Sequence, residues 1–156
     1  MNNFQIKALP YNQFAHLFSA NAEELKNIGA LKMMADGFPG FPCRVSLQDA
    51  PVGEEVILLP FKHNKTTSPY QAMGPIFIRQ DAIATTLGIN EIPTMLMHRL
   101  LSLRSYNKEG MMIQAIVIEG KMTSETLQNL FTNKEIAYVH IHNAKPGCYN
   151  CLAKRA

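Results

Sequence analysis

Residues 135–151 read EIAYVHIHNAKPGCYNC, and this stretch gathers more chemically reactive side chains than any other part of the chain. From residue 136 to 142 the side chains alternate with a period of two, as they do along a β-strand. One face carries Ala137, Val139 and Ile141. Small and β-branched apolar residues of this kind favour a strand that packs on a core. The stretch therefore predicts a strand of a sheet with one buried face.

The opposite face of this strand carries His140 and His142, which lie roughly 6.6 Å apart along a standard strand. Pro146-Gly147 then predicts a turn. Cys148 and Cys151 follow at a Cys-x-x-Cys spacing, which allows two thiolates to reach one centre. Two imidazoles and two thiolates match a zinc site in number and type. One hypothesis is therefore a zinc site built from these four residues.

Two other interpretations of the same residues stay open. Cys148 and Cys151 could form a redox pair, although such pairs usually sit at a helix N-terminus and only five residues follow Cys151. Alternatively, the histidines are half-buried polar residues of a strand and the cysteines are inert. The sequence alone does not choose between a metal, a redox and a structural role.

The composition is that of a soluble globular protein, with 47% hydrophobic and 17% charged residues in 156. This length predicts one domain over residues 1–156 that buries about 70% of its unfolded surface. A net charge of +3 without any long basic run argues against a nucleic-acid partner. The apolar runs are too short to cross a membrane. An odd number of cysteines and the lack of an export signal predict a reduced, cytoplasmic protein.

Short strands and helices are expected to alternate along the chain. Strands are predicted over residues 4–9, 30–35, 55–61, 76–78, 100–106, 111–119 and 136–143. Helices are predicted from Pro10, from the capping pair Asn21 and Glu24 to Gly29, over 81–87, from Pro93 to His98, and from Thr123 to Asn133. The last helix joins two strands that would run parallel in one sheet, whereas residues 107–110 predict an antiparallel hairpin. The fold class is therefore α+β, with a mixed, mostly antiparallel sheet covered by a few short helices.

Further reactive residues fall in or beside loops. The glycine- and proline-rich loop 36–42 leads to Cys43 and Arg44, and a thiol beside a guanidinium can act as a nucleophile. Cys43 could equally be a small buried hydrophobic residue. A polar loop at 63–70 contains Ser68 and Tyr70. Arg79 ends a buried strand, where it would either clamp an anion or pair with an acid such as Asp81.

Several phrases of the chain occur together in a familiar order: GFPCRVSL (40–47), PVGEE (51–55), SPY (68–70), GPIFIR (74–79), LRSY (103–106) and HIHNA (140–144) with GC (147–148). Over about residues 4–156 the sequence resembles the bacterial Domain of Unknown Function 1203 family, which carries no established activity, substrate or cofactor. The resemblance implies a shared site among the polar residues of these phrases, which are Cys43, Arg44, Ser68, Tyr70, Arg79, Arg104, His140, His142, Asn143 and Cys148. Lys154 departs from the acidic residue that relatives often carry there.

Two function classes follow from these residues. In the first, the protein binds a small anionic molecule or acts as an enzyme: Arg44 and Arg79 hold the anion, Asn143 orients it, and His140 or His142 moves a proton. Ser68 and Tyr70 would join this pocket as ligand-binding residues, and Cys43 is a third catalytic candidate. In the second, the histidines and the Cys-x-x-Cys pair form a zinc-binding structural or interaction module. The substrate, the reaction and the oligomeric state, a homodimer included, stay open.

Overall fold

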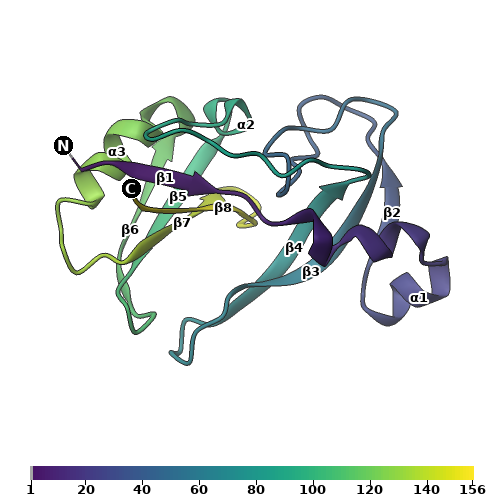
Figure 1. The fold of residues 1–156 in the computed structure, drawn as a ribbon, viewed down its shortest axis with the longest axis horizontal. Helices are drawn as coiled ribbons and strands as arrows, with labels where there is room; N and C mark the ends of the chain where they lie inside the picture. The colour runs from purple at the N-terminus through teal and green to yellow at the C-terminus, as the bar shows by residue number, and fades with distance from the viewer. Residues whose placement is uncertain (1) are drawn as a thin grey trace.

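In the computed structural model, which describes residues 2–156, eight strands form two sheets (Figure 1). The strand order is β1-β8-β7-β5-β6 in the five-stranded sheet and β2-β3-β4 in the three-stranded sheet, and all neighbouring strands are antiparallel. This confirms an α+β fold with mostly antiparallel sheets. The strands are β1 (Phe4–Lys7), β2 (Leu31–Met34), β3 (Glu55–Asn64), β4 (Ala72–Arg79), β5 (Leu100–Tyr106), β6 (Met112–Glu119), β7 (Tyr138–Asn143) and β8 (Tyr149–Arg155).

The helices are short. They are α1 (Ala22–Asn27), α2 (Thr94–Met97) and α3 (Thr123–Leu130), with 3-10 turns η1 (Tyr11–Gln13), η2 (Ala15–Ser19) and η3 (Gly120–Met122). The predicted capping box forms: Asn21 accepts from the Glu24 amide at 2.9 Å, and Glu24 accepts from the Asn21 amide at 2.8 Å. Within residues 2–156, the structure contains no helix with the length and apolar character needed to cross a membrane.

Each sheet has its own hydrophobic core. Helix α3 covers one face of the five-stranded sheet, where its Leu127 and Phe131 are buried together with Val139 and Ile141 of β7. On the three-stranded sheet, a second core joins Ile57 and Leu59 of β3 to apolar side chains of the segment 14–25. Figure 1 shows the N-terminal part of the chain in purple, running from β1, an edge strand of the five-stranded sheet, to α1 beside the three-stranded sheet. The face of β7 opposite α3 is the one that carries the histidines.

The two sheets are also joined at the tips of their hairpins, which lie close together at the lower edge of Figure 1. The Ser68 hydroxyl donates to the Gly110 carbonyl at 2.7 Å, and the Thr66 hydroxyl donates to the Glu109 carbonyl at 3.2 Å. Gly110 has a φ of +77°, and a Cβ there would lie 2.0 Å from the Thr66 Oγ1. A glycine is therefore required for the hairpins to meet this closely.

Four differences from the sequence-based expectation have physical causes. No helix forms over residues 81–87, because Asp81 has a left-handed φ of 53° and the Thr85 amide donates to Val45 instead of to its own turn. The apolar stripe after Pro10 forms the 3-10 turns η1 and η2, without an α-helix. The strand expected over 55–61 continues to Asn64. Strands β6 and β7 do run parallel, but β5 lies between them and pairs with both.

A fifth difference is the C-terminal strand. The sequence pattern assigned no element to residues 149–155, yet β8 lies between β1 and β7 and pairs with both. Its sequence, YNCLAKR, does not alternate regularly between apolar and polar residues, and its pairing with β7 contains a register shift. The prediction that residues 1–156 form a single domain stays a prediction.

Candidate metal centre

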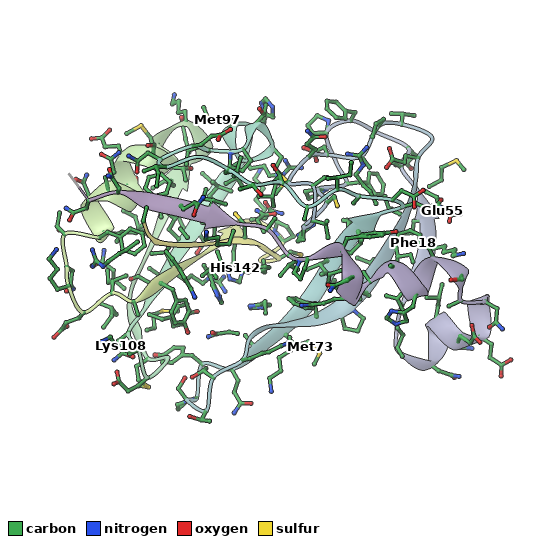
Figure 2. The ribbon with its side chains drawn as sticks, viewed as in Figure 1. Phe18, Glu55, Met73, Met97, Lys108 and His142 are labelled. Atoms are coloured by element: carbon green, nitrogen blue, oxygen red, sulfur yellow. The ribbon has the colours of Figure 1, made fainter. Side chains whose placement is uncertain are left out.

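Three histidines converge in the space between the two sheets. His140 and His142 project from β7, and His63 projects from β3. One ring nitrogen from each lies within 4.8 Å of the other two. The centroid of the His63 ring is 5.9 Å from that of His140 and 5.0 Å from that of His142. Figure 2 shows His142 near the middle of the molecule, where the strands of the two sheets approach each other.

The alternation of the strands places these side chains. On β7, Val139 and Ile141 enter the core under α3, so His140 and His142 point to the other face. On β3, Ile57, Leu59 and Phe61 pack in or against the second core, and His63 follows two residues later, at a register shift where Lys62 pairs with Met73 and Asn64 with Ala72. Both strands therefore direct their histidines towards the space between the sheets.

A β-bulge adds a tyrosine to the same place. Ile141 pairs with Cys151 but His142 pairs with Tyr149, so Asn150 is an extra residue in β8. Because of this extra residue, Cys151 faces the core under α3, whereas Tyr149 faces the histidines. The Tyr149 ring stacks on His63 with centroids 5.2 Å apart and 4° between the planes. The bulge thus separates two side chains that a regular strand would put on one face.

Each histidine has a buried ring nitrogen without a hydrogen-bond partner in residues 2–156. These atoms are Nδ1 of His63, Nδ1 of His140 and Nε2 of His142. The other nitrogen of His142, Nδ1, lies 2.9 Å from the Gly147 carbonyl oxygen. A carbonyl only accepts, so Nδ1 carries the proton and Nε2 keeps its lone pair. A backbone carbonyl that fixes the tautomer in this way is typical of a metal-binding histidine.

The surroundings keep all three imidazoles neutral. Burial is the main cause that lowers the pKa of His63 to about 4, of His140 to about 3 and of His142 to about 4. The positive charge of Arg104, which pairs with His140 across β5 and β7, lowers all three further. Neutral imidazole is the form that binds metal ions. Within the described residues, the group contains no carboxylate that would hold a proton on a histidine.

Aromatic rings surround His140. The centroids of Tyr106, Tyr138 and Tyr149 lie 5.5, 5.1 and 5.1 Å from that of His140. Tyr138 is itself fixed by its hydroxyl, which donates to Asn64 Oδ1 at 2.9 Å. Rings packed this closely leave the His140 side chain little freedom to rotate.

A cleft of about 410 Å³ reaches His140 from the surface. Three lysines line it, Lys65 and Lys108 from the two hairpins and Lys154 from β8. The described lining contains no aspartate or glutamate. The approach to the histidines is therefore positively charged, which favours anionic molecules.

The structure separates the cysteines from this group. Neither Cys148 nor Cys151 belongs to the set of converging metal-ligand side chains in residues 2–156. Cys151 is 1% exposed in the core under α3, and burial raises the pKa of its thiol to about 12. Cys43 is fully buried in the core of the three-stranded sheet, where its sulfur accepts from the amides of Ser46 and Arg79. Cys43 and Cys151 therefore lie where small apolar side chains usually fill a hydrophobic core.

The remaining predicted residues lie in two other places. Arg79 makes two hydrogen bonds to Glu54, at 2.6 and 3.0 Å, and its pKa is raised mainly by them. It therefore pairs with an acid, but not with Asp81. Ser68 and Tyr70 lie in the β3–β4 hairpin. The Asn64 side chain links this hairpin to β7, because it donates to the Tyr70 carbonyl and accepts from the Tyr138 hydroxyl. Arg44, Asn143 and Cys148 line a separate cavity between the ends of the sheets.

His63 is the member that the sequence-based site lacked. The polar residues 63–70, which follow the apolar run 55–61, predict a loop here. The alternation of Ile57, Leu59 and Phe61, continued for one more step, was the signal that could have found it. Its spatial partner could not be inferred, because 77 residues separate it from His140 and no strand pairing joins β3 to β7.

No curated protein and no solved structure matches the chain. A family model does match, over residues 40–155, and this region contains all three histidines, the Tyr149 bulge and the lysine-lined cleft. The match covers most of the chain and confirms the resemblance noted from the sequence, although it begins at residue 40 and not near residue 4. The chain therefore belongs to the family described as "Protein of unknown function (DUF1203)".

Proposed function

We propose that the protein binds one divalent transition-metal ion, of the zinc class, through His63, His140 and His142. The observation that carries this proposal is the convergence of three neutral imidazoles, each with a buried nitrogen that has no hydrogen-bond partner within residues 2–156. Leaving a buried nitrogen without a partner costs free energy. Coordination of one metal ion would offset this cost at all three histidines. The proposal replaces the ligand set expected from sequence, because His63 takes the place of Cys148 and Cys151.

The distances are compatible with an ion after a small adjustment. Around a tetrahedral zinc with bonds of about 2.0–2.1 Å, the ligand atoms lie roughly 3.4 Å from one another. The ring nitrogens lie within 4.8 Å of one another, so the three side chains would move closer by no more than about 1.4 Å. His140 is held by its aromatic neighbours, so small side-chain rotations of His63 and His142 towards it would supply a movement of this size.

Three protein ligands leave a fourth position for water or for a substrate, as in catalytic zinc sites. Neutral imidazoles do not reduce the double positive charge of the ion, and Arg104 adds a further positive charge beside it. A fourth ligand with a negative charge is therefore favoured, either hydroxide formed from bound water or a small anionic molecule. The lysine-lined cleft at His140 gives such a molecule a path to the ion. The reaction class that this arrangement supports is metal-assisted attack of water.

Metal content per chain tests the proposal. The protein is purified without a histidine tag, incubated with zinc, desalted and analysed by mass spectrometry. About one zinc per chain is expected in the wild type and much less than one in His63→Ala and His140→Ala. His16→Ala is the matched control, because His16 is an exposed histidine outside the group and should leave the zinc content unchanged. Zinc content near zero in the wild type, or unchanged in His63→Ala, would overturn the proposal.

A further inference from the structure

A second cavity borders the β3–β4 strand pair and the start of β5, and its lining does not include the three histidines. It has a volume of about 760 Å³, which is within the range of small-molecule sites. Its walls are mainly apolar: Leu58 and Phe77 come from the three-stranded sheet and Leu100 from β5. Its polar lining residues are Arg44, His98, Arg99, Asn143 and Lys145, and the described lining contains no aspartate or glutamate.

Arg44 is a buried cation that lacks an acidic partner. It is 2% exposed, and none of the salt bridges found in residues 2–156 includes it. Its Nε donates to the Tyr149 carbonyl at 2.7 Å and its Nη1 donates to the Pro42 carbonyl, but no hydrogen bond of Nη2 occurs within the described residues. Burial lowers the pKa of Arg44 to about 10, so the guanidinium stays charged at neutral pH. Burying an unpaired charge is costly, and an anion in the cavity would offset that cost.

The other polar groups of the cavity are also donors. Asn143 is 9% exposed, and its Oδ1 accepts from Asn150 Nδ2 at 2.7 Å, which leaves its own amide nitrogen free to donate. Lys145 is exposed at the rim. Arg99 also lines the cavity, but its charge is already paired with Asp49: its Nη2 lies 2.5 Å from the Asp49 Oδ1. The polar end of the cavity therefore offers a guanidinium N–H, an amide N–H and an ammonium group to the same ligand.

We infer that this cavity binds a small carboxylate with an apolar body. The carboxylate accepts from Arg44 Nη2 and Asn143 Nδ2, and the apolar body lies between Leu58, Phe77 and Leu100. A guanidinium is well suited to a carboxylate because both groups are planar. The apolar walls exclude inorganic anions as good ligands, since these would gain the charge interaction but not the burial of apolar surface. This site does not depend on the metal ion at the histidines.

Binding of 1-naphthoate tests the inference, with the uncharged 1-naphthalenemethanol as the matched ligand. Calorimetric titration is carried out on the metal-free protein and again on the zinc-loaded protein. We expect naphthoate to bind at least 10-fold more tightly than the alcohol in both forms. Equal affinities for the two ligands, or no naphthoate binding up to millimolar concentration, would overturn the inference. Zinc content is measured separately, so failure here leaves the metal proposal standing and the reverse also holds.

Variants of the cavity lining test whether naphthoate binds in the cavity. Leu100→Trp fills the space from a side chain that is 42% exposed, and should weaken naphthoate binding at least 10-fold without loss of folding. Ile116→Trp is its control, because Ile116 is 41% exposed on β6 and does not line the cavity. Arg44→Met should abolish the preference for naphthoate over the alcohol. If that variant does not fold, Lys145→Met should still reduce the preference, and unchanged binding in both Leu100→Trp and Lys145→Met would contradict the inference.

Cys148 provides an independent measurement in the wild type. It lines the cavity and is partly exposed, whereas Cys43 and Cys151 are 0% and 1% exposed. Iodoacetamide should therefore modify Cys148 in the native protein, and saturating naphthoate should slow this modification several-fold. An unchanged rate under saturation would place the ligand elsewhere and overturn the inference.

Discussion

The imidazole of His63 lies parallel to the phenol ring of Tyr149, with 5.2 Å between the ring centroids and 4° between the ring planes. The two residues come from different sheets, so their contact fixes β3 against β8 at the histidine group. The bulge at Asn150 makes the contact, because without it Tyr149 would share the core face of Cys151. In the proposed metal site, Tyr149 would therefore be a positioning residue that orients His63 without being a ligand.

Replacing Tyr149 therefore tests the positioning of His63. Tyr149→Leu should lower zinc affinity about 10- to 100-fold, the range found when groups that orient metal ligands are removed. Tyr149→Phe keeps the ring and should stay within a few-fold of the wild type. Competition with a chromophoric chelator measures both affinities. Equal losses in the two variants would show that the hydroxyl, and not the stacked ring, is what matters.

The lowered pKa values predict how the stability of the metal-free protein depends on pH. In the unfolded chain the histidines titrate near 6.5, whereas in the folded protein the pKa of His140 is about 3 and that of His142 about 4. Between these values the unfolded state binds more protons than the folded state, so the free energy of unfolding falls as the pH falls. The loss should begin near pH 6.5 and continue to about pH 4.

Urea denaturation in the presence of a chelator measures this loss. A buried histidine that titrates only in the unfolded state contributes about 1.4 kcal/mol per pH unit. His140→Gln removes one such group, so its stability curve should be shallower than that of the wild type between pH 6.5 and 4 and similar in slope above pH 7. Parallel curves over the whole range would mean that folding does not lower the pKa of His140.

The strand pattern predicted much of the fold. Alternation located β5, β6 and β7, and the spacing of Leu127, Leu130 and Phe131 gave the buried side of α3, because these signals depend only on neighbours in the sequence. The same reasoning missed β8, since its bulge breaks the period of two. It also predicted one sheet where two form, because the pairing of distant strands is not encoded in local periodicity.

The candidate site shows the same limit. His140 and His142 were predicted together because a single strand places both on one face. The Cys-x-x-Cys pair was added on spacing alone, and the bulge directs Cys151 away from the histidines. His63 and the unpaired charge of Arg44 follow from contacts between the sheets, which no pattern within one strand reports.

The cysteines should contribute nothing to zinc binding. Cys151→Ala is expected to keep about one zinc per chain, because the thiol lies in the core under α3 and its pKa of about 12 disfavours the thiolate that binds metal. Its stability should fall modestly, since a buried sulfur is lost. Metal analysis and thermal melting measure the two effects. Loss of zinc in a folded Cys151→Ala protein would instead support a ligand set that includes the cysteines.

Gly110 and Thr66 are in contact across the two hairpins and line the cleft at His140, and Gly110→Ala tests the role of this contact. A Cβ at residue 110 would lie 2.0 Å from Thr66 Oγ1, and the φ of +77° is unfavourable for alanine. Gly53→Ala is the matched control, because Gly53 has a φ of +86° but nothing within 4 Å of the added Cβ. Both variants carry the backbone strain, which costs about 1–2 kcal/mol. Only Gly110→Ala also forces the hairpins apart.

We therefore expect Gly110→Ala to be the less stable of the two in urea denaturation. It should also lower zinc affinity, because separation of the hairpins moves His63, at the end of β3, away from β7. Thr66→Gly in the same chain removes the atoms that collide with the new Cβ, so the double variant should recover part of both properties; it should stay below Gly53→Ala, because it also loses the hydrogen bond from Thr66 to Glu109. Equal stability and zinc affinity in Gly110→Ala and Gly53→Ala would show that the hairpin contact does not hold the metal site together.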